Sequence, residues 1–303
     1  MASLKHTAEY VPTAVLVKLA CLLPDGVADR LGAGLGSLAH AILTSRRRIA
    51  IDNLTRAMGD TLGQEEIRRV TREVFRGIGR TVIEFARFGR LGIEGTRRIV
   101  FDPDGGREVL QKVLDEGKGA VLICPHFGNW ELAGAWAASE GFPIDFWVGT
   151  QHNQKIDELF NRFRREMGVG IIPLATGLKQ IFKGLRSGRF GCVVPDQHAP
   201  AESIILDFFG RPASMAKGPA LFAVRCVSPV VPFLLRRERY DRHILMPGKP
   251  IYPPGSGDTE ADIRTITAAY MKFFEDGIRK HPEQWMWTHR RWKVDARSNK
   301  TLV

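Results

Sequence analysis

Short apolar runs alternate with amphipathic stretches through the middle of the chain. Residues 121–124 and 190–194 are continuously apolar, as expected of strands that are covered on both faces. A helical pattern at residues 177–185 precedes the second run. Further strand-like segments lie at residues 144–149, 229–235 and 243–246. Because alternating strands and helices are typical of parallel βαβ units, the sequence predicts a single α/β domain with a mixed, mainly parallel sheet flanked by helices.

Helical periodicity is clearest in the longer stretches. Residues 64–88 and 258–280 repeat apolar side chains at helical intervals, and residues 105–116 form a shorter pattern of the same kind. Residues 155–167 are also predicted to be helical and carry Arg162, Arg164 and Arg165. An arginine on the binding side of this helix would be able to clamp a phosphate or carboxylate.

The first fifty residues form a distinct helical lead-in. Residues 10–23 are apolar, but Pro12 opens the stretch, Lys18 interrupts it, and it is shorter than the roughly 20 residues that cross a bilayer. Either it docks on the core or it lies in a membrane interface. A second helical pattern at residues 27–43 ends before Arg46-Arg47-Arg48, a cluster that suits anionic headgroups or a solvated face. We expect residues 1–50 to be a membrane-associating lead-in and residues 51–303 to be the α/β domain.

The charge balance points to an acidic partner. Lys and Arg number 44 against 33 Asp and Glu, which gives a formal net charge of +11. We expect no nucleic acid, because the chain carries no zinc-knuckle spacing, RNA-binding aromatic signature or helix-turn-helix pattern. The four cysteines contain no C-x-x-C pair and are expected to be buried free thiols.

The chemistry is predicted where the first buried strand ends. His126 and Glu131 are five positions apart, about 140° around a helix, so His126 must precede the helix that we expect at residues 130–139. Asn129 is a good N-cap, and Glu131 then falls in the first turn, where it would be able to orient the His126 imidazole. The alternative is a loop histidine beside an ordinary first-turn acid. Backbone amides at Phe127 and Gly128 are expected as oxyanion donors.

The second buried strand delivers Asp196, Gln197 and His198. Carboxyl ends of parallel strands lie on one side of a sheet, so these residues are expected near His126. One histidine with one carboxylate is a poor zinc site, and neither G-x-x-x-x-G-K-S/T nor a G-x-G-x-x-G after a strand is present. We therefore expect no metal and no cofactor. Ser203 and Ser214 lack a neighbouring base in the sequence, so no covalent intermediate on either residue is required.

Several of these segments together resemble a known family. His126-Phe-Gly-Asn-Trp-Glu131 is similar to the His-x4-Asp/Glu motif of the lysophospholipid acyltransferase superfamily, and more narrowly to the lipid A biosynthesis late acyltransferases (lauroyl and myristoyl transferases) and their relatives that acylate phosphatidylinositol mannosides. Further matches lie at Val194-Pro195-Asp196-Gln197, Asp207-Phe208-Phe209-Gly210 and residues 216–223, 230–233 and 282–293. The set is specific because the segments follow in this order and at these separations from residue 126 to residue 293.

The resemblance implies a function. An acyl group would pass from acyl carrier protein, or less often acyl-CoA, to a hydroxyl of a lipid A precursor, with His126 as general base and Glu131 orienting it. The alternatives are acyl-CoA-dependent acylation of a phosphatidylinositol mannoside or other glycolipid, and a catalytically inactive lipid-binding protein at a membrane surface. The implied location is the cytoplasmic face of the inner membrane.

The resemblance also implies binding residues. Arg164 occupies the place of an arginine that the family uses, and we expect it to bind substrate together with Asn129, Asp196 and Gln197. Asp196 is expected to be structural or substrate-orienting. His198 departs from the family, in which many members carry an acidic residue at that place. The aromatic and basic tail at residues 285–292 suits either a headgroup boundary or packing under the sheet.

Overall fold

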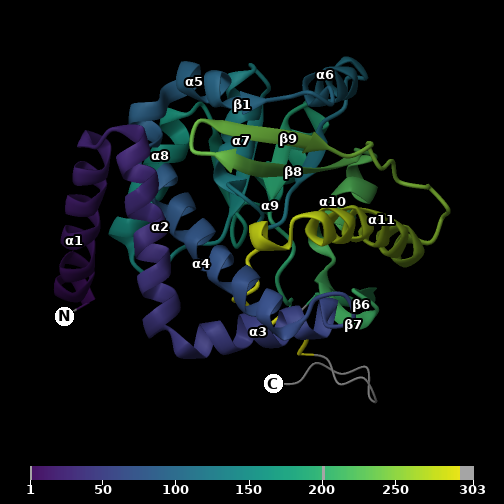
Figure 1. Cartoon of the computed structure of the whole chain (residues 1–303). Helices are drawn as coiled ribbons and strands as arrows, with labels where there is room; N and C mark the ends of the chain where they lie inside the picture. The colour runs from purple at the N-terminus through teal and green to yellow at the C-terminus, as the bar shows by residue number, and fades with distance from the viewer. Residues whose placement is uncertain (1, 200–201, 294–303) are drawn as a thin grey trace.

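A seven-stranded sheet forms the centre of the protein (Figure 1). The computed structural model describes residues 2–199 and 202–293. The strand order is β1-β9-β8-β2-β5-β3-β4, and the five strands from β8 to β4 are mutually parallel, whereas β9 runs antiparallel to β8. The strands are β1 Val100–Phe101, β2 Ala120–Ile123, β3 Ile144–Val148, β4 Gly170–Pro173, β5 Phe190–Val193, β8 Val230–Arg239 and β9 Arg242–Pro247. The predicted mixed, mainly parallel sheet is therefore confirmed.

Helices cover both faces of the sheet, and β2 shows why its sequence is continuously apolar. Val121 and Ile123 pack into one hydrophobic cluster, while Ala120 and Leu122 pack into the other. The first cluster includes residues of α3 Thr44–Met58, α4 Gln64–Ala86, α9 Leu178–Arg186, α10 Gly218–Cys226 and α11 Thr259–Lys280. The second includes residues of α5 Phe88–Ile99, α6 Gly106–Asp115, α7 Trp130–Ser139 and α8 Gln154–Glu166.

Several elements were not predicted from the sequence, among them α3, α5, β1 and the elements described next. A separate hairpin, β6 Ser203–Phe208 and β7 Arg211–Ala216, has no neighbour in the main sheet. The edge strand β4 has the sequence Gly-Ile-Ile-Pro, so it lacks the continuous apolar run that indicated β2. Helix α10 contains few polar residues and is partly buried against α9 and α11, so it lacks an amphipathic pattern.

The chain begins with two helices on one flank of the molecule (Figure 1). Helices α1 Ala2–Leu22 and α2 Asp25–Ile42 precede α3, which runs across residue 50. The division between lead-in and domain at residue 50 therefore stays a prediction. None of the helices in the described residues is both long enough and apolar enough to span a membrane.

Part of the aromatic and basic tail at residues 285–292 packs inside the protein. Trp285 and Trp287 are almost fully buried and belong to the same hydrophobic cluster as α11. Of the two predictions for the tail, packing against the body of the protein is therefore the one that the structure supports at these residues.

Helices α2 and α4 touch through glycines. A Cβ at Gly36 would lie 2.2 Å from the Phe75 carbonyl oxygen, and a Cβ at Gly79 would lie 2.2 Å from the Gly32 carbonyl oxygen. These contacts are with backbone, which cannot move aside as a flexible side chain can. By contrast, a Cβ at Gly34 would meet no atom within 4 Å.

We predict that Gly36→Ala lowers the free energy of unfolding by about 1–3 kcal/mol, because the added methyl forces α2 away from α4. Gly34→Ala is the matched control and should raise it by up to about 1 kcal/mol, because alanine is the better helix former. Urea denaturation followed by circular dichroism measures both values. Equal effects of the two substitutions would contradict the close helix contact.

Candidate functional site

His126 lies on the loop between β2 and α7. Its backbone N–H donates to Asp196 Oδ2 at 2.9 Å, and its Nδ1 lies 2.7 Å from Asp196 Oδ1. The side chain is 18% exposed. Among the described residues, Nε2 has no hydrogen-bond partner, and His126 lines a cavity of about 230 Å³. One ring nitrogen is thus fixed by the protein, while the other is available to a substrate.

Asp196 follows β5, the strand next to β2, and is buried. Its Oδ2 also accepts a hydrogen bond from Trp285 Nε1 at 2.6 Å. Burial alone would raise the pKa of Asp196, but the attraction of His126 and the hydrogen bonds from His126 and Trp285 outweigh it and lower the pKa. Asp196 is therefore an ionised carboxylate held against the His126 imidazole. The prediction that the ends of the two buried strands meet is confirmed.

Glu131 has a different partner from the one we expected. It lies in the first turn of α7, and its carboxylate accepts two hydrogen bonds from Arg164 on α8, from Nε at 2.9 Å and Nη2 at 2.5 Å. No hydrogen bond or ion pair joins Glu131 to His126, both of which are described residues. The expectation that Glu131 orients the imidazole is therefore corrected: Asp196 is the carboxylate in contact with it.

Two of the expected substrate-binding residues are occupied within the fold. Arg164 also donates from Nη1 to Asn161 Oδ1 at 2.9 Å, and its guanidinium carbon lies 5.4 Å from the centroid of the Phe85 ring. Asn129 is fully buried. Its Oδ1 accepts from the Leu132 N–H at 3.0 Å, which caps α7, and its Nδ2 donates to Glu84 at 2.7 Å. Asn129 has no exposed surface with which to bind a substrate, whereas substrate binding by Arg164, whose side chain is 13% exposed, stays a prediction.

The other two expected substrate-binding residues are Asp196 and Gln197. Asp196 is hydrogen-bonded to His126. Gln197 is partly buried beside it, and its role in binding substrate stays a prediction.

The amides expected to hold an oxyanion are also occupied. The Phe127 N–H donates to the Pro125 carbonyl at 2.7 Å, and the Gly128 N–H donates to the Gln284 carbonyl at 2.9 Å. The loop therefore uses these donors for its own structure, and that expectation is corrected.

The sequence did not predict the aromatic and imidazole side chains that surround His126 and Asp196. Trp285 bonds to Asp196, and the Trp130 ring meets the His126 ring edge-on at 4.8 Å between centroids. His289 Nε2 accepts from the His198 N–H at 3.4 Å, and burial lowers the pKa of His289. The N–H of a buried indole usually has a hydrogen-bond acceptor. The apolar residues around Trp285 in the sequence were therefore the one signal that could have predicted such a contact.

Two cavities adjoin this site. The first contains His126 and Trp130 together with Arg80, Arg239 and Glu283, so most of its named groups are polar. The second, of about 320 Å³, is bounded by α2, α4, α5 and the β8–β9 turn. Its apolar wall contains Ile83, Phe88, Leu91 and Leu132. Asp29, Arg80 and Tyr240 line both cavities, so the two adjoin each other.

Known proteins resemble this chain over different lengths. This chain is 28% identical over 199 residues to phosphatidylinositol mannoside acyltransferase of Mycobacterium tuberculosis (strain ATCC 25618 / H37Rv). The aligned residues cover 63% of this chain and 60% of that protein. The match thus spans about three-fifths of that relative. It is also 28% identical over 277 residues to the lipid A biosynthesis lauroyltransferase of Escherichia coli (strain K12), covering 90% of this chain and 87% of that protein.

A solved structure can also be aligned. The crystal structure of the 1-acyl-sn-glycerophosphate acyltransferase of Thermotoga maritima covers 82% of this chain and 99% of its own, with a TM-score of 0.36 and 13% sequence identity.

The sequence model of one family matches nearly the whole chain. Its description is bacterial lipid A biosynthesis acyltransferase, and it matches residues 2–294. The resemblance found in the sequence is confirmed, and the chain belongs to the bacterial lipid A biosynthesis acyltransferase family.

Proposed function

We propose that this protein moves a fatty acyl chain from an acyl thioester to a hydroxyl of an anionic glycolipid. The observation that carries the proposal is the His126–Asp196 contact, which fixes Nδ1 and leaves Nε2 facing a cavity. A base oriented by a carboxylate is the arrangement that activates a hydroxyl for acyl transfer. Family membership agrees with this chemistry.

In the proposed reaction, His126 Nε2 takes the proton of the acceptor hydroxyl while that oxygen attacks the thioester carbonyl carbon. The Asp196 carboxylate stabilises the imidazolium that forms. Collapse of the tetrahedral intermediate breaks the carbon–sulfur bond, and the imidazolium returns its proton to the departing thiolate. Helix α7 begins directly after the loop, so its positive end favours the negative charge that develops on the carbonyl oxygen.

The two cavities suit the two parts of such a reaction. The polar cavity at His126 suits the sugar and phosphate groups of an acceptor, because Arg80 and Arg239 line it. The adjoining cavity suits an acyl chain, because its wall contains Ile83, Phe88, Leu91 and Leu132. The Glu131–Arg164 pair then has a supporting role: it ties the first turn of α7 to α8 beside the site.

Acyl carrier protein as donor and a lipid A precursor as acceptor are our first assignment. The lauroyltransferase match over 90% of this chain supports it. Acyl-CoA with a phosphatidylinositol mannoside is the second assignment, supported by the shorter mycobacterial match. The chemistry at His126 is the same in both.

We predict that His126→Ala lowers the rate of acyl transfer by about 10²–10⁴-fold, the usual contribution of a general base. Transfer of a labelled acyl group from acyl carrier protein to a tetra-acylated lipid A precursor measures the rate, with acyl-CoA and phosphatidylinositol mannoside run in parallel. His152→Ala, at an exposed position in the loop before α8, is the control and should keep the full rate. Full activity of folded His126→Ala would refute the proposed base.

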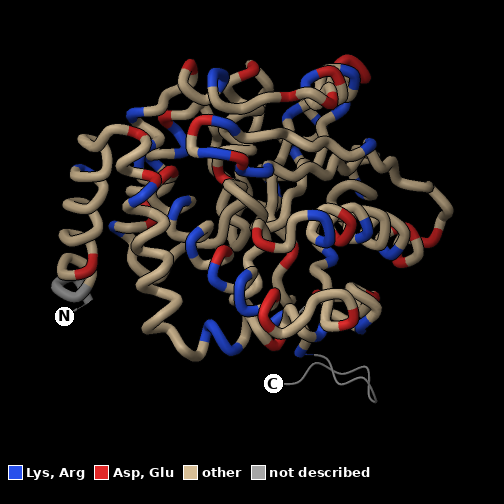
Figure 2. The backbone as a smooth tube through the Cα atoms, viewed as in Figure 1, with Lys and Arg blue, Asp and Glu red and all other residues tan. Residues whose placement is uncertain are grey.

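We also propose that α1 and α2 attach the protein peripherally to the cytoplasmic face of the inner membrane. Large apolar side chains are exposed along both helices: Val11, Val15, Leu16, Leu19 and Leu22 on α1, and Val27, Leu35, Leu38 and Ile42 on α2. Figure 2 shows few charged residues on α1 and on the half of α2 nearest α3, with basic residues where α3 begins. Arg46 and Arg48 are exposed there and suit anionic headgroups.

We predict that Leu19→Asp with Leu38→Asp weakens binding to anionic vesicles by at least about 10-fold, because burying one leucine contributes about 1.5–3 kcal/mol. Vesicle co-sedimentation measures the binding. Leu178→Asp, on α9, replaces a leucine that is also exposed but lies outside this face, and it should leave binding unchanged. If the double variant binds as the unaltered protein does, the assigned face is wrong.

A further inference from the structure

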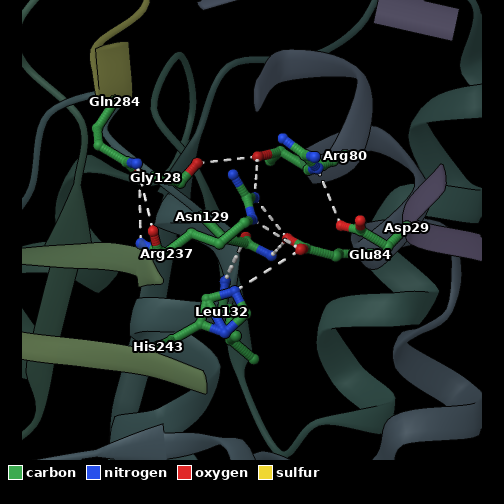
Figure 3. A network of polar contacts seen from close by, with 10 residues as sticks. Asp29, Arg80, Glu84, Gly128, Asn129, Leu132, Arg237, His243 and Gln284 are labelled. Carbon is green, nitrogen blue, oxygen red and sulfur yellow. Dashed lines mark hydrogen bonds and ion pairs between the residues drawn. The ribbon is translucent and has the colours of Figure 1, made fainter. Parts of the chain in front are cut away.

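A buried ion pair lies behind the loop that carries His126 (Figure 3). Arg237 on β8 donates to Glu84 on α4 from Nε to Oε1 at 2.8 Å and from Nη2 to Oε2 at 2.6 Å. The two side chains are 7% and 19% exposed. Removing both charges from water costs about as much as their attraction returns, so stability alone does not account for the pair.

Both partners of the pair reach the loop. Glu84 Oε2 accepts a hydrogen bond from Asn129 Nδ2 at 2.7 Å, and Asn129 in turn caps α7. Arg237 Nη2 donates to Thr81 Oγ1 at 2.7 Å, and that hydroxyl donates to the Gly128 carbonyl at 2.8 Å. Two consecutive residues of the loop are therefore tied to one ion pair, as Figure 3 shows.

The loop backbone has little room to move. Gly128 has a φ of +56°, and a Cβ there would lie 1.9 Å from the Leu235 carbonyl oxygen on β8. The Gln284 carbonyl accepts the Gly128 N–H, and the Gln284 side chain bonds to the Arg237 backbone at 3.2 Å and 3.3 Å. The loop is thus held between α4, β8 and the short helix η1 Pro282–Gln284.

The charge of Glu84 is balanced by Arg237. Burial would raise the pKa of Glu84, but the charge and hydrogen bonds of Arg237 outweigh it and lower the pKa. His243 on β9 is fully buried beside the pair, with Nε2 3.6 Å from Glu84 and neither ring nitrogen hydrogen-bonded to any described residue. Burial lowers the pKa of His243 to about 4, so it is neutral at pH 7.

We propose that Glu84 is a positioning residue for acyl transfer: through Asn129 it fixes the loop and so holds the His126 imidazole against Asp196. This inference rests on the proposed function. Glu84 acts through Asn129 and takes no part in the proton transfer. A displacement of His126 by about 1 Å is enough to cost up to about 100-fold in rate.

The test exchanges the hydrogen-bond donor and the hydrogen-bond acceptor between positions 84 and 129. Asn129→Asp keeps the cap of α7 but places a carboxylate against Glu84, and Glu84→Gln removes the charge that balances Arg237. We expect each substitution to lower kcat by about 10–100-fold with KM changed less than about twofold. In the double variant, the amide introduced at position 84 donates to the carboxylate introduced at position 129, and the net charge is restored. The kcat of the double variant should therefore recover at least about 10-fold over either single variant.

Asp145→Asn is the matched control. Asp145 on β3 accepts two hydrogen bonds from Arg189 at 2.6 Å and 2.7 Å. This ion pair is also doubly hydrogen-bonded, is more exposed at its arginine, and lies on elements other than the His126 loop. We expect the substitution to lower the unfolding midpoint and leave kcat unchanged. If kcat falls as much in Asp145→Asn as in Glu84→Gln, or if the double variant is no faster than the single ones, the inference is overturned.

Amide hydrogen exchange provides a readout that does not depend on turnover. The His126 and Gly128 N–H groups donate to Asp196 and to the Gln284 carbonyl. Both should exchange faster in each single variant and return towards the original rate in the double variant. If the unaltered protein transfers an acyl group between no pair of acyl donor and glycolipid acceptor, the proposed function fails. Unchanged exchange of these two amides in the single variants would instead overturn the inference itself.

Discussion

The contact between His126 and Asp196 depends on the pairing of two parallel strands. Ile123 on β2 is in register with Val193 on β5; His126 lies three residues after Ile123, and Asp196 lies three residues after Val193. The sheet therefore sets the distance between His126 and Asp196, which are 70 residues apart in the sequence. Trp285, delivered from the far end of the chain, then completes the hydrogen bonding of Asp196. The rest of the site is arranged around this contact.

Three acidic side chains in and around the site each have a separate partner. Asp196 meets His126, Glu131 meets Arg164, and Glu84 meets Arg237. Because each carboxylate has a cation or hydrogen-bond donors where it lies, none is left without a partner in a poorly hydrated region, which would cost several kcal/mol. The pairs also connect different elements: the first orients the proposed base, the second joins α7 to α8, and the third bonds to the loop between β2 and α7.

The sequence predicted the strands that carry the site residues better than it predicted the side-chain contacts between those residues. The continuous apolar runs located β2 and β5, and the rule that parallel strands end on one side of a sheet brought Asp196 to His126. Local spacing favoured Glu131 as the partner of His126, because nothing in the sequence shows that Arg164, 33 residues further on, takes both carboxylate oxygens. Asn129 was correctly expected to cap α7, but its second contact is with Glu84, inside a helix whose pattern indicated only core packing. Contacts between distant segments leave no periodic signal, so side-chain partners were the part that sequence could not provide.

Nitrogen-15 NMR of the histidine rings would show directly which residue orients the base. Because the Asp196 carboxylate can only accept, neutral His126 should carry its proton on Nδ1 and leave Nε2 unprotonated. Asp196→Asn should abolish this preference, and Glu131→Gln should preserve it; His126→Ala identifies the signal. A proton on Nε2 in the unaltered protein, or loss of the Nδ1 tautomer in Glu131→Gln alone, would contradict Asp196 as the residue that orients the base.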